Sequence, residues 1–94
     1  DAPPDVQRLL ADTHAPEPLA PLLTPTTLSP DRFGRVPKYY VHTLRDRAIF
    51  PQFQQWMVKR NGTVRQVFPL DAGHYVFLTQ PTAVADILEQ IART

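Results

Sequence analysis

The fold is decided by two short stretches, Val36-Pro-Lys-Tyr-Tyr-Val-His-Thr43 and Thr63-Val-Arg-Gln-Val-Phe68. Both are rich in the β-branched and aromatic residues that favour strands. Between them lies Pro51-Gln-Phe-Gln-Gln-Trp-Met-Val-Lys-Arg60, whose proline suits the first turn of a helix. A strand, a helix and a second strand in this order predict an α/β fold with two parallel strands.

The helical segments show the expected periodicity. Phe53, Trp56 and Met57 recur at i, i+3 and i+4, which predicts that they form a buried, core-packing face. Pro69 is expected to end the second strand, and Pro81 to open a final helix. The apolar stripe of that last helix consists of Val84, Ile87, Leu88 and Ile91. The complete order of elements is therefore βαβα.

The first third of the chain has a different character. Eight of the eleven prolines fall at or before Pro37, and each removes a backbone donor and restricts the preceding residue. Only short helices are expected there, at residues 5–11 and 19–23. We predict that residues 1–33 form a covering element or lid outside the sheet core.

Composition limits the class of protein. The 94 residues allow one small domain, and 43% apolar content is typical of a folded chain. A net charge of +1 without a basic stripe makes nucleic acid and anionic membrane poor partners. No run approaches the roughly 20 apolar residues needed to span a bilayer, and no leader peptide is expected. We expect a soluble protein, with cytoplasmic and secreted locations both left open.

Asp46 and His74 are the candidate catalytic residues. Each follows one of the two predicted strands, and the carboxyl ends of parallel strands meet at the same edge of a sheet. An acid that orients a histidine base is two-thirds of a hydrolytic triad. The alternative is that Asp46 is a solvated charge between two arginines and His74 a loop residue without a role. Asp71 is a weaker rival for the acid, because it lies only three residues from the histidine.

The nucleophile of such a triad is not evident. Ser29 is the only serine, and it does not lie in a Gly-X-Ser-X-Gly elbow between a strand and a helix. The chain has no cysteine, and its three histidines are too dispersed to suggest a metal site. Two parallel strands with exposed edges also make an incomplete domain. We therefore expect that this polypeptide completes a larger sheet supplied by another segment.

The motifs of the chain closely resemble the C-terminal part of one α/β-hydrolase branch. That branch contains the plant methylesterases, the related hydroxynitrile lyases and bacterial esterase relatives, and the resemblance covers residues 15–93. The matching residues are Asp31-Arg-Phe-Gly-Arg-Val36, Tyr40, Asp46, Ile49, Pro51, Phe53-Gln54, Trp56-Met57, Gly73-His74 and Pro81. The resemblance implies that Asp46 and His74 are the triad acid and base. It implies that residues 1–33 are the end of a cap, and that residues 34–94 are the C-terminal part of the core domain. It also implies that the serine elbow and the oxyanion hole lie in a preceding segment or a companion chain.

One departure bears on the reaction. The hydroxynitrile lyases carry a lysine directly after the histidine, where this chain has Tyr75. We therefore expect hydrolysis of a small carboxylic ester, without a metal or an organic cofactor. Ile49 and Tyr75 are the candidates for lining the substrate pocket. The sequence leaves two alternative functions open: a carbon–carbon lyase on the same fold, and a small binding module without catalysis. It also leaves open whether the protein forms a homodimer.

Overall fold

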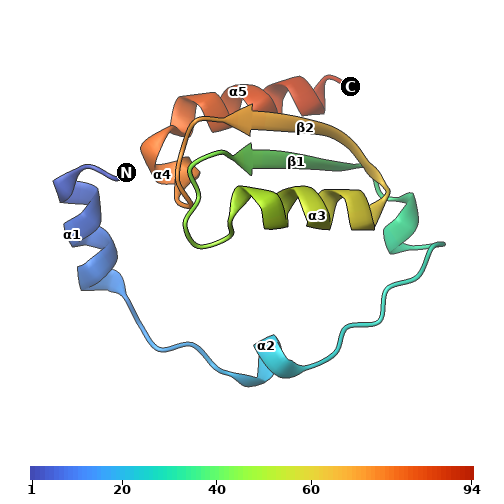
Figure 1. Ribbon diagram of the computed structural model, residues 1–94, viewed down its shortest axis with the longest axis horizontal. Coiled ribbons are helices and arrows are strands. Elements are labelled where there is room, and N and C mark those ends of the chain that lie inside the picture. The colour runs from blue at the N-terminus through green and yellow to red at the C-terminus, as the bar shows by residue number, and fades with distance from the viewer.

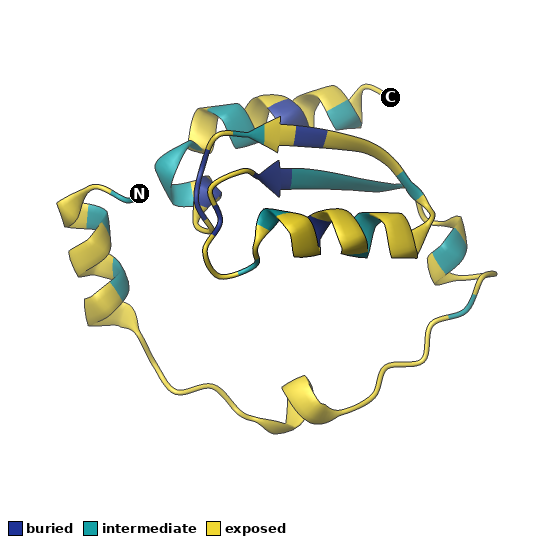
Figure 2. Cartoon of the chain, viewed as in Figure 1, coloured by how far each residue is buried: buried dark blue, intermediate teal, exposed yellow.

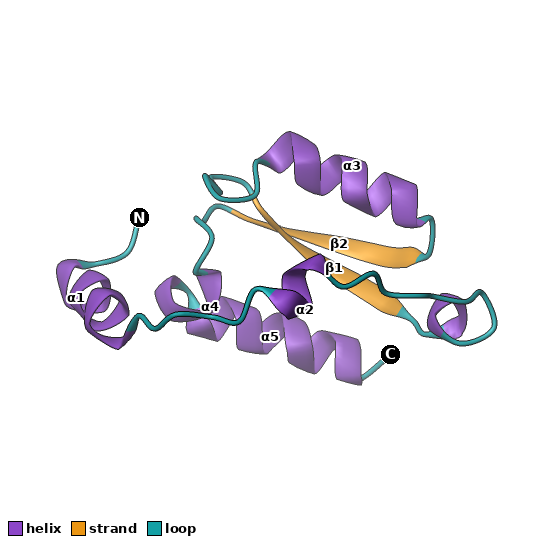
Figure 3. Ribbon diagram, turned by 90° about the horizontal axis from the view of Figure 1, so that it is seen from below, coloured by secondary structure: helices purple, strands orange, loops and turns teal.

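A pair of parallel strands forms the centre of the computed structural model, which describes residues 1–94. The strands are β1 (Lys38–Thr43) and β2 (Val64–Leu70), with Tyr40 opposite Val67 and Thr43 opposite Leu70. Helix α3 (Pro51–Asn61) connects them and covers one side, and α5 (Pro81–Ala92) covers the other (Figures 1 and 3). The predicted βαβα order with parallel strands is therefore confirmed.

Helix α3 begins and ends where its sequence predicts. Pro51 occupies the first helical position, and Lys59 and Arg60 lie in the last turn, where they favour the helix dipole. Gly62 follows the helix with a φ of 71°, a left-handed conformation that costs glycine little. Its amide donates to the Val58 carbonyl and closes the last turn.

The prediction of a buried face formed by Phe53, Trp56 and Met57 is wrong, because Met57 is only half-buried and the other two residues are exposed. Phe53 is 49% exposed and Trp56 is 52% exposed, and their rings stack on each other with centroids 5.4 Å apart. The residue of α3 that is fully buried against β1 is Gln54, which is 1% exposed. Apolar periodicity identifies a helix, but here a polar side chain faces the strand because it satisfies backbone groups at the strand end.

The end of β2 and the following loop also differ from expectation. Pro69 does not end the strand, which continues through it to Leu70. A proline is tolerated because β2 is an edge strand of a two-stranded sheet. The short helix α4 (Val76–Thr79) lies between Pro69 and Pro81, where no helix is expected from the sequence. In α5, Ile87 is buried as predicted, whereas Leu88 is exposed.

The first third of the chain lies largely outside the core. It contains α1 (Pro4–Thr13), α2 (Ala20–Leu23) and the 3-10 turn η1 (Phe33–Arg35), and none of its residues is buried (Figure 2). The connection from α1 to η1 arcs away from the sheet, while α1 itself lies near α4 (Figure 1). None of the helices is both long enough and apolar enough to cross a membrane.

Candidate active site

Two loops meet at the carboxyl edge of the sheet. Pairing continues beyond the strands, because the Leu44 amide donates to the Leu70 carbonyl and the Arg45 amide to the Ala72 carbonyl, both at 3.0 Å. The Arg45 guanidinium then reaches Asp71, with Nε 2.7 Å from Oδ1 and a second bond of 2.9 Å to its carbonyl. The loop after β1 is thus fastened to the loop after β2.

This arrangement brings Asp46 and His74 into contact. Oδ2 of Asp46 lies 2.9 Å from Nδ1 of His74, although the two residues are 28 positions apart in the sequence. The side chain of Asp46 is only 3% exposed, whereas that of His74 is 46% exposed. The pair therefore has a buried acid and an accessible imidazole.

Four donors surround the carboxylate of Asp46. Oδ1 accepts the amides of Ala48 at 2.9 Å and Ile49 at 2.8 Å. Oδ2 accepts the hydroxyl of Thr43 at 2.7 Å in addition to the imidazole. Burial alone would raise the pKa of Asp46, but the hydrogen bonds from His74, Ile49, Thr43 and Ala48 outweigh it and hold the pKa well below its usual range. Asp46 is therefore a carboxylate at neutral pH.

The ionised carboxylate determines which nitrogen of His74 carries the proton. A carboxylate can only accept, so Nδ1 must be the protonated nitrogen and donate to Oδ2. In the neutral imidazole, Nε2 then keeps its lone pair. This is the tautomer that a general base requires, with the basic nitrogen on the side away from the acid.

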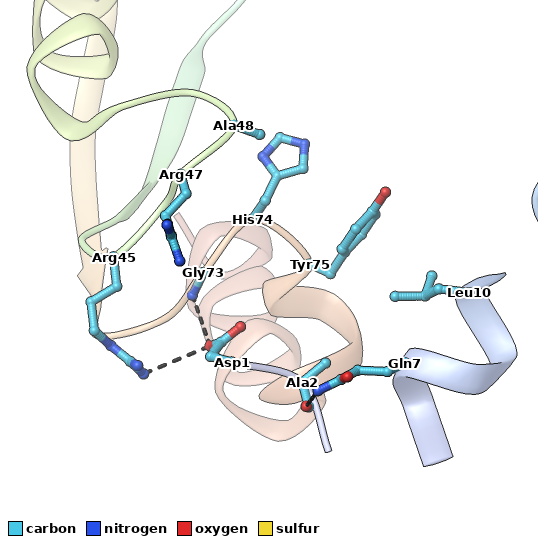
Figure 4. Close-up of a pocket in the computed structure, with 10 residues that line it drawn as sticks. All are labelled: Asp1, Ala2, Gln7, Leu10, Arg45, Arg47, Ala48, Gly73, His74 and Tyr75. Atoms are coloured by element: carbon cyan, nitrogen blue, oxygen red, sulfur yellow. Dashed lines mark hydrogen bonds and ion pairs between the residues drawn. The ribbon is translucent and has the colours of Figure 1, made fainter. Parts of the chain in front are cut away.

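A cavity of about 450 Å³ opens beside His74, and Figure 4 shows its lining. Tyr75 stands edge-on to the imidazole, with ring centroids 5.4 Å apart, and Leu10 of α1 lies across the cavity from it. Asp1 lies nearby, and its carboxylate accepts the Gly73 amide at 2.9 Å. The ten lining residues are Asp1, Ala2, Gln7, Leu10, Arg45, Arg47, Ala48, Gly73, His74 and Tyr75.

Of the other candidate residues from the sequence, only Tyr75 lies at the cavity. Tyr75 lines the cavity, while Ile49 does not and instead supports Asp46 through its backbone amide, so its role toward a substrate stays a prediction. Asp71 binds Arg45 rather than His74, and its side chain is 78% exposed. Ser29 accepts the Gly34 amide through its carbonyl and is not among the residues that line the cavity. No group of three His, Asp or Glu side chains is placed to hold a metal ion.

The sequence did not indicate a role in the site for two residues that the structure places there. Thr43 is the last residue of β1, and Gln54 lies in the first turn of α3. Both are buried, and hydrogen bonds join them to each other and to the loop that carries Asp46. The only signal was their polar character at positions next to a strand end and a helix start, which many surface residues share.

The environment of Asp46 predicts a dependence of stability on pH. The carboxyl has a lower pKa in the folded protein than in the unfolded chain, so acid protonates the unfolded state first. Its stabilising contribution is therefore complete well above about pH 4, the ordinary aspartate pKa, and is lost progressively as the pH falls below it. The midpoint of thermal unfolding should fall more steeply on acidification for the wild type than for Asp46→Asn. Equal acid slopes would contradict this assignment.

Comparison with known proteins identifies one family and several relatives. The profile of the Alpha/beta hydrolase family matches residues 1–87. Putative methylesterase 14, chloroplastic, of Arabidopsis thaliana is 34% identical over 83% of this chain, and Alpha-hydroxynitrile lyase of the same plant is 37% identical over 68%. Methyl jasmonate esterase 1 of Vitis vinifera is 25% identical over 78%. The chain spans 22%, 25% and 28% of the lengths of these three relatives.

Proposed function

Because the chain belongs to the α/β-hydrolase family, we propose that it supplies the acid and the base of a serine-dependent carboxylesterase. The observation that carries the proposal is the 2.9 Å contact between the buried Asp46 and the accessible His74. The serine elbow and the oxyanion hole are assigned to a preceding segment or a companion chain. We call this chain together with that segment the assembled enzyme. The chain alone is expected to be inactive.

In the proposed mechanism His74 transfers protons in both halves of the reaction. Nε2 removes the proton of the serine hydroxyl as its oxygen attacks the ester carbonyl, and the resulting imidazolium is stabilised by Asp46. The tetrahedral intermediate collapses when the imidazolium returns this proton to the leaving alcohol. A water molecule, deprotonated by the same nitrogen, then attacks the acyl-serine and releases the carboxylic acid. As the second tetrahedral intermediate collapses, the bond between the acyl carbon and the serine oxygen breaks, and the imidazolium returns its proton to that oxygen.

The cavity beside His74 fits a small substrate. Its volume lies within the 300 to 1,000 Å³ range that is typical of small-molecule sites. Tyr75 and Leu10 give it an apolar side, and Arg45 and Arg47 a polar one. Methylesterases among the relatives support a small ester as the substrate class. Residues 1–33 are proposed as the end of the cap, since α1 contributes to the cavity wall.

A serine-reactive fluorophosphonate tests the proposal directly. We expect denaturing mass spectrometry of the assembled enzyme to show one phosphonyl adduct, because a triad-activated serine attacks this reagent and becomes trapped. The adduct should be on a separate polypeptide or on a single chain longer than these 94 residues. A heat-denatured sample is the matched control and should remain unlabelled. An unlabelled native sample, or an adduct on the 10.7 kDa chain itself, would contradict the proposal.

A carbon–carbon lyase is the second candidate, favoured by the 37% identity to Alpha-hydroxynitrile lyase. The same pair could serve such a reaction, but Tyr75 occupies the position where the resemblance leads us to expect a lysine in lyases. Incubation of the assembled enzyme with mandelonitrile and with a methyl ester separates the two candidates. Cyanide release without ester hydrolysis would replace the esterase proposal with the lyase.

A further inference from the structure

We infer that Gln54 is a positioning residue for the acid of the proposed catalytic pair, acting through Thr43 and Ile49. The inference rests on the proposed function of Asp46 and His74. Gln54 contacts neither of these two residues. It is nevertheless the most completely buried large side chain of the molecule, with 1% of its surface exposed.

The amide of Gln54 is fully bonded. Oε1 accepts the backbone amide of Thr43 at 3.0 Å, and Nε2 lies 3.1 Å from the carbonyl of the same residue. Nε2 also donates to the Ile49 carbonyl at 2.7 Å. A flipped amide would place its NH₂ against the Thr43 N–H and its oxygen against two carbonyls, so this orientation is the one that the surroundings permit. A buried amide is costly unless it is bonded, and this one holds the end of β1 and the acid loop together.

The first connection to Asp46 runs through the hydroxyl of Thr43. Nε2 of Gln54 lies 3.0 Å from Oγ1 of Thr43, and that Oγ1 lies 2.7 Å from Oδ2 of Asp46. One proton of the Gln54 amide goes to the Ile49 carbonyl, and the other is shared between the carbonyl and the hydroxyl of Thr43. The single hydroxyl proton of Thr43 goes to the charged Oδ2 of Asp46 at 2.7 Å rather than to the neutral Oε1 of Gln54 at 3.3 Å. Oδ2 is the same oxygen that accepts His74 Nδ1.

The second connection runs through the backbone of Ile49. Gln54 binds the carbonyl of this residue, and its amide donates to Oδ1 of Asp46 at 2.8 Å. Each oxygen of the carboxylate is thus held by a residue that Gln54 itself fixes. Removing the amide would allow both supports to shift, and the carboxylate would rotate relative to the imidazole. Since small misplacements of catalytic groups have large kinetic effects, this geometry makes Gln54 important for the rate.

The test is Gln54→Met in the assembled enzyme. Methionine keeps the length of the side chain and its helix propensity but removes every hydrogen bond. We expect kcat for ester hydrolysis to fall by about 10- to 100-fold with KM little changed. The downfield proton NMR signal of His74 Nδ1–H should move upfield or broaden, because its acceptor is no longer fixed. The matched control is Gln52→Met, two residues away on the same helix and exposed, which should behave as wild type.

The outcomes separate this inference from the proposed function. A folded Gln54→Met enzyme with wild-type kcat and an unmoved Nδ1–H signal would overturn the inference. If that variant does not fold, Thr43→Val and Thr43→Ser decide, because valine removes the hydroxyl and serine keeps it. Loss of rate in the valine variant with recovery in the serine variant supports the connection, and wild-type rates in both overturn it. Retained activity in His74→Ala would instead remove the proposed function itself.

Discussion

Replacing His74 with alanine should reduce kcat of the assembled enzyme by about 10⁶-fold, as expected when a triad base is lost. Nε2 of His74 is the only base that the site presents to the cavity next to a buried acid. The fold should remain intact, because almost half of the side chain is exposed and its only side-chain hydrogen bond is to Asp46. In this variant the buried carboxylate of Asp46 still accepts hydrogen bonds from Thr43, Ala48 and Ile49, which continue to stabilise its charge.

The measurement is steady-state hydrolysis of a chromogenic ester, with circular dichroism to monitor folding. His14→Ala is a matched control, since His14 lies in the exposed segment after α1 and makes no side-chain hydrogen bond. That variant should keep wild-type kcat. A folded His74→Ala enzyme that still hydrolyses the ester at the wild-type rate would eliminate the mechanism.

The sequence was sufficient to predict that Asp46 and His74 meet, because their positions follow from strand order. Two strand-forming stretches separated by one helix can pair in parallel, and residues directly after such strands meet at one edge. Asp46 and His74 follow their strands by three and four residues, so their contact was predictable without side-chain detail. The family match and the parallel pair confirm the α/β-hydrolase fold class that the motifs indicated.

The remaining features depend on contacts that local patterns do not encode. Helix α3 faces the free N–H and C=O of Thr43 at the end of β1. The side-chain amide of Gln54 can bond to both groups, whereas an indole has only a donor. Gln54 is therefore buried there, and Trp56 is exposed. Helix α1 lies beside the cavity, where the Asp1 side chain accepts a hydrogen bond from the Gly73 amide. Secondary-structure propensity describes neighbouring residues and cannot predict a contact between residues 72 positions apart. Burial of a polar residue is decided by available partners rather than by periodicity.

Asp46→Asn should reduce kcat by about 10⁴-fold while preserving the shape of the site. The variant amide has one oxygen and one NH₂ group, and the amides of Ala48 and Ile49 require the oxygen on their side. The NH₂ group must then face His74, where it can only donate. Nδ1 becomes an acceptor, the imidazole proton moves to Nε2, and the nitrogen nearest the serine can no longer act as a base.

This explanation predicts a change of tautomer as well as a loss of rate. Nitrogen-15 NMR of His74 should show a protonated Nδ1 in the wild type and a protonated Nε2 in Asp46→Asn. Asp71→Asn is the matched control, because Asp71 is the rival acid that the sequence offers and it binds Arg45 at the surface. That variant should lose little activity. A 10⁴-fold loss in Asp71→Asn with normal turnover in Asp46→Asn would move the acid to the second loop, and the buried carboxylate would then serve stability alone.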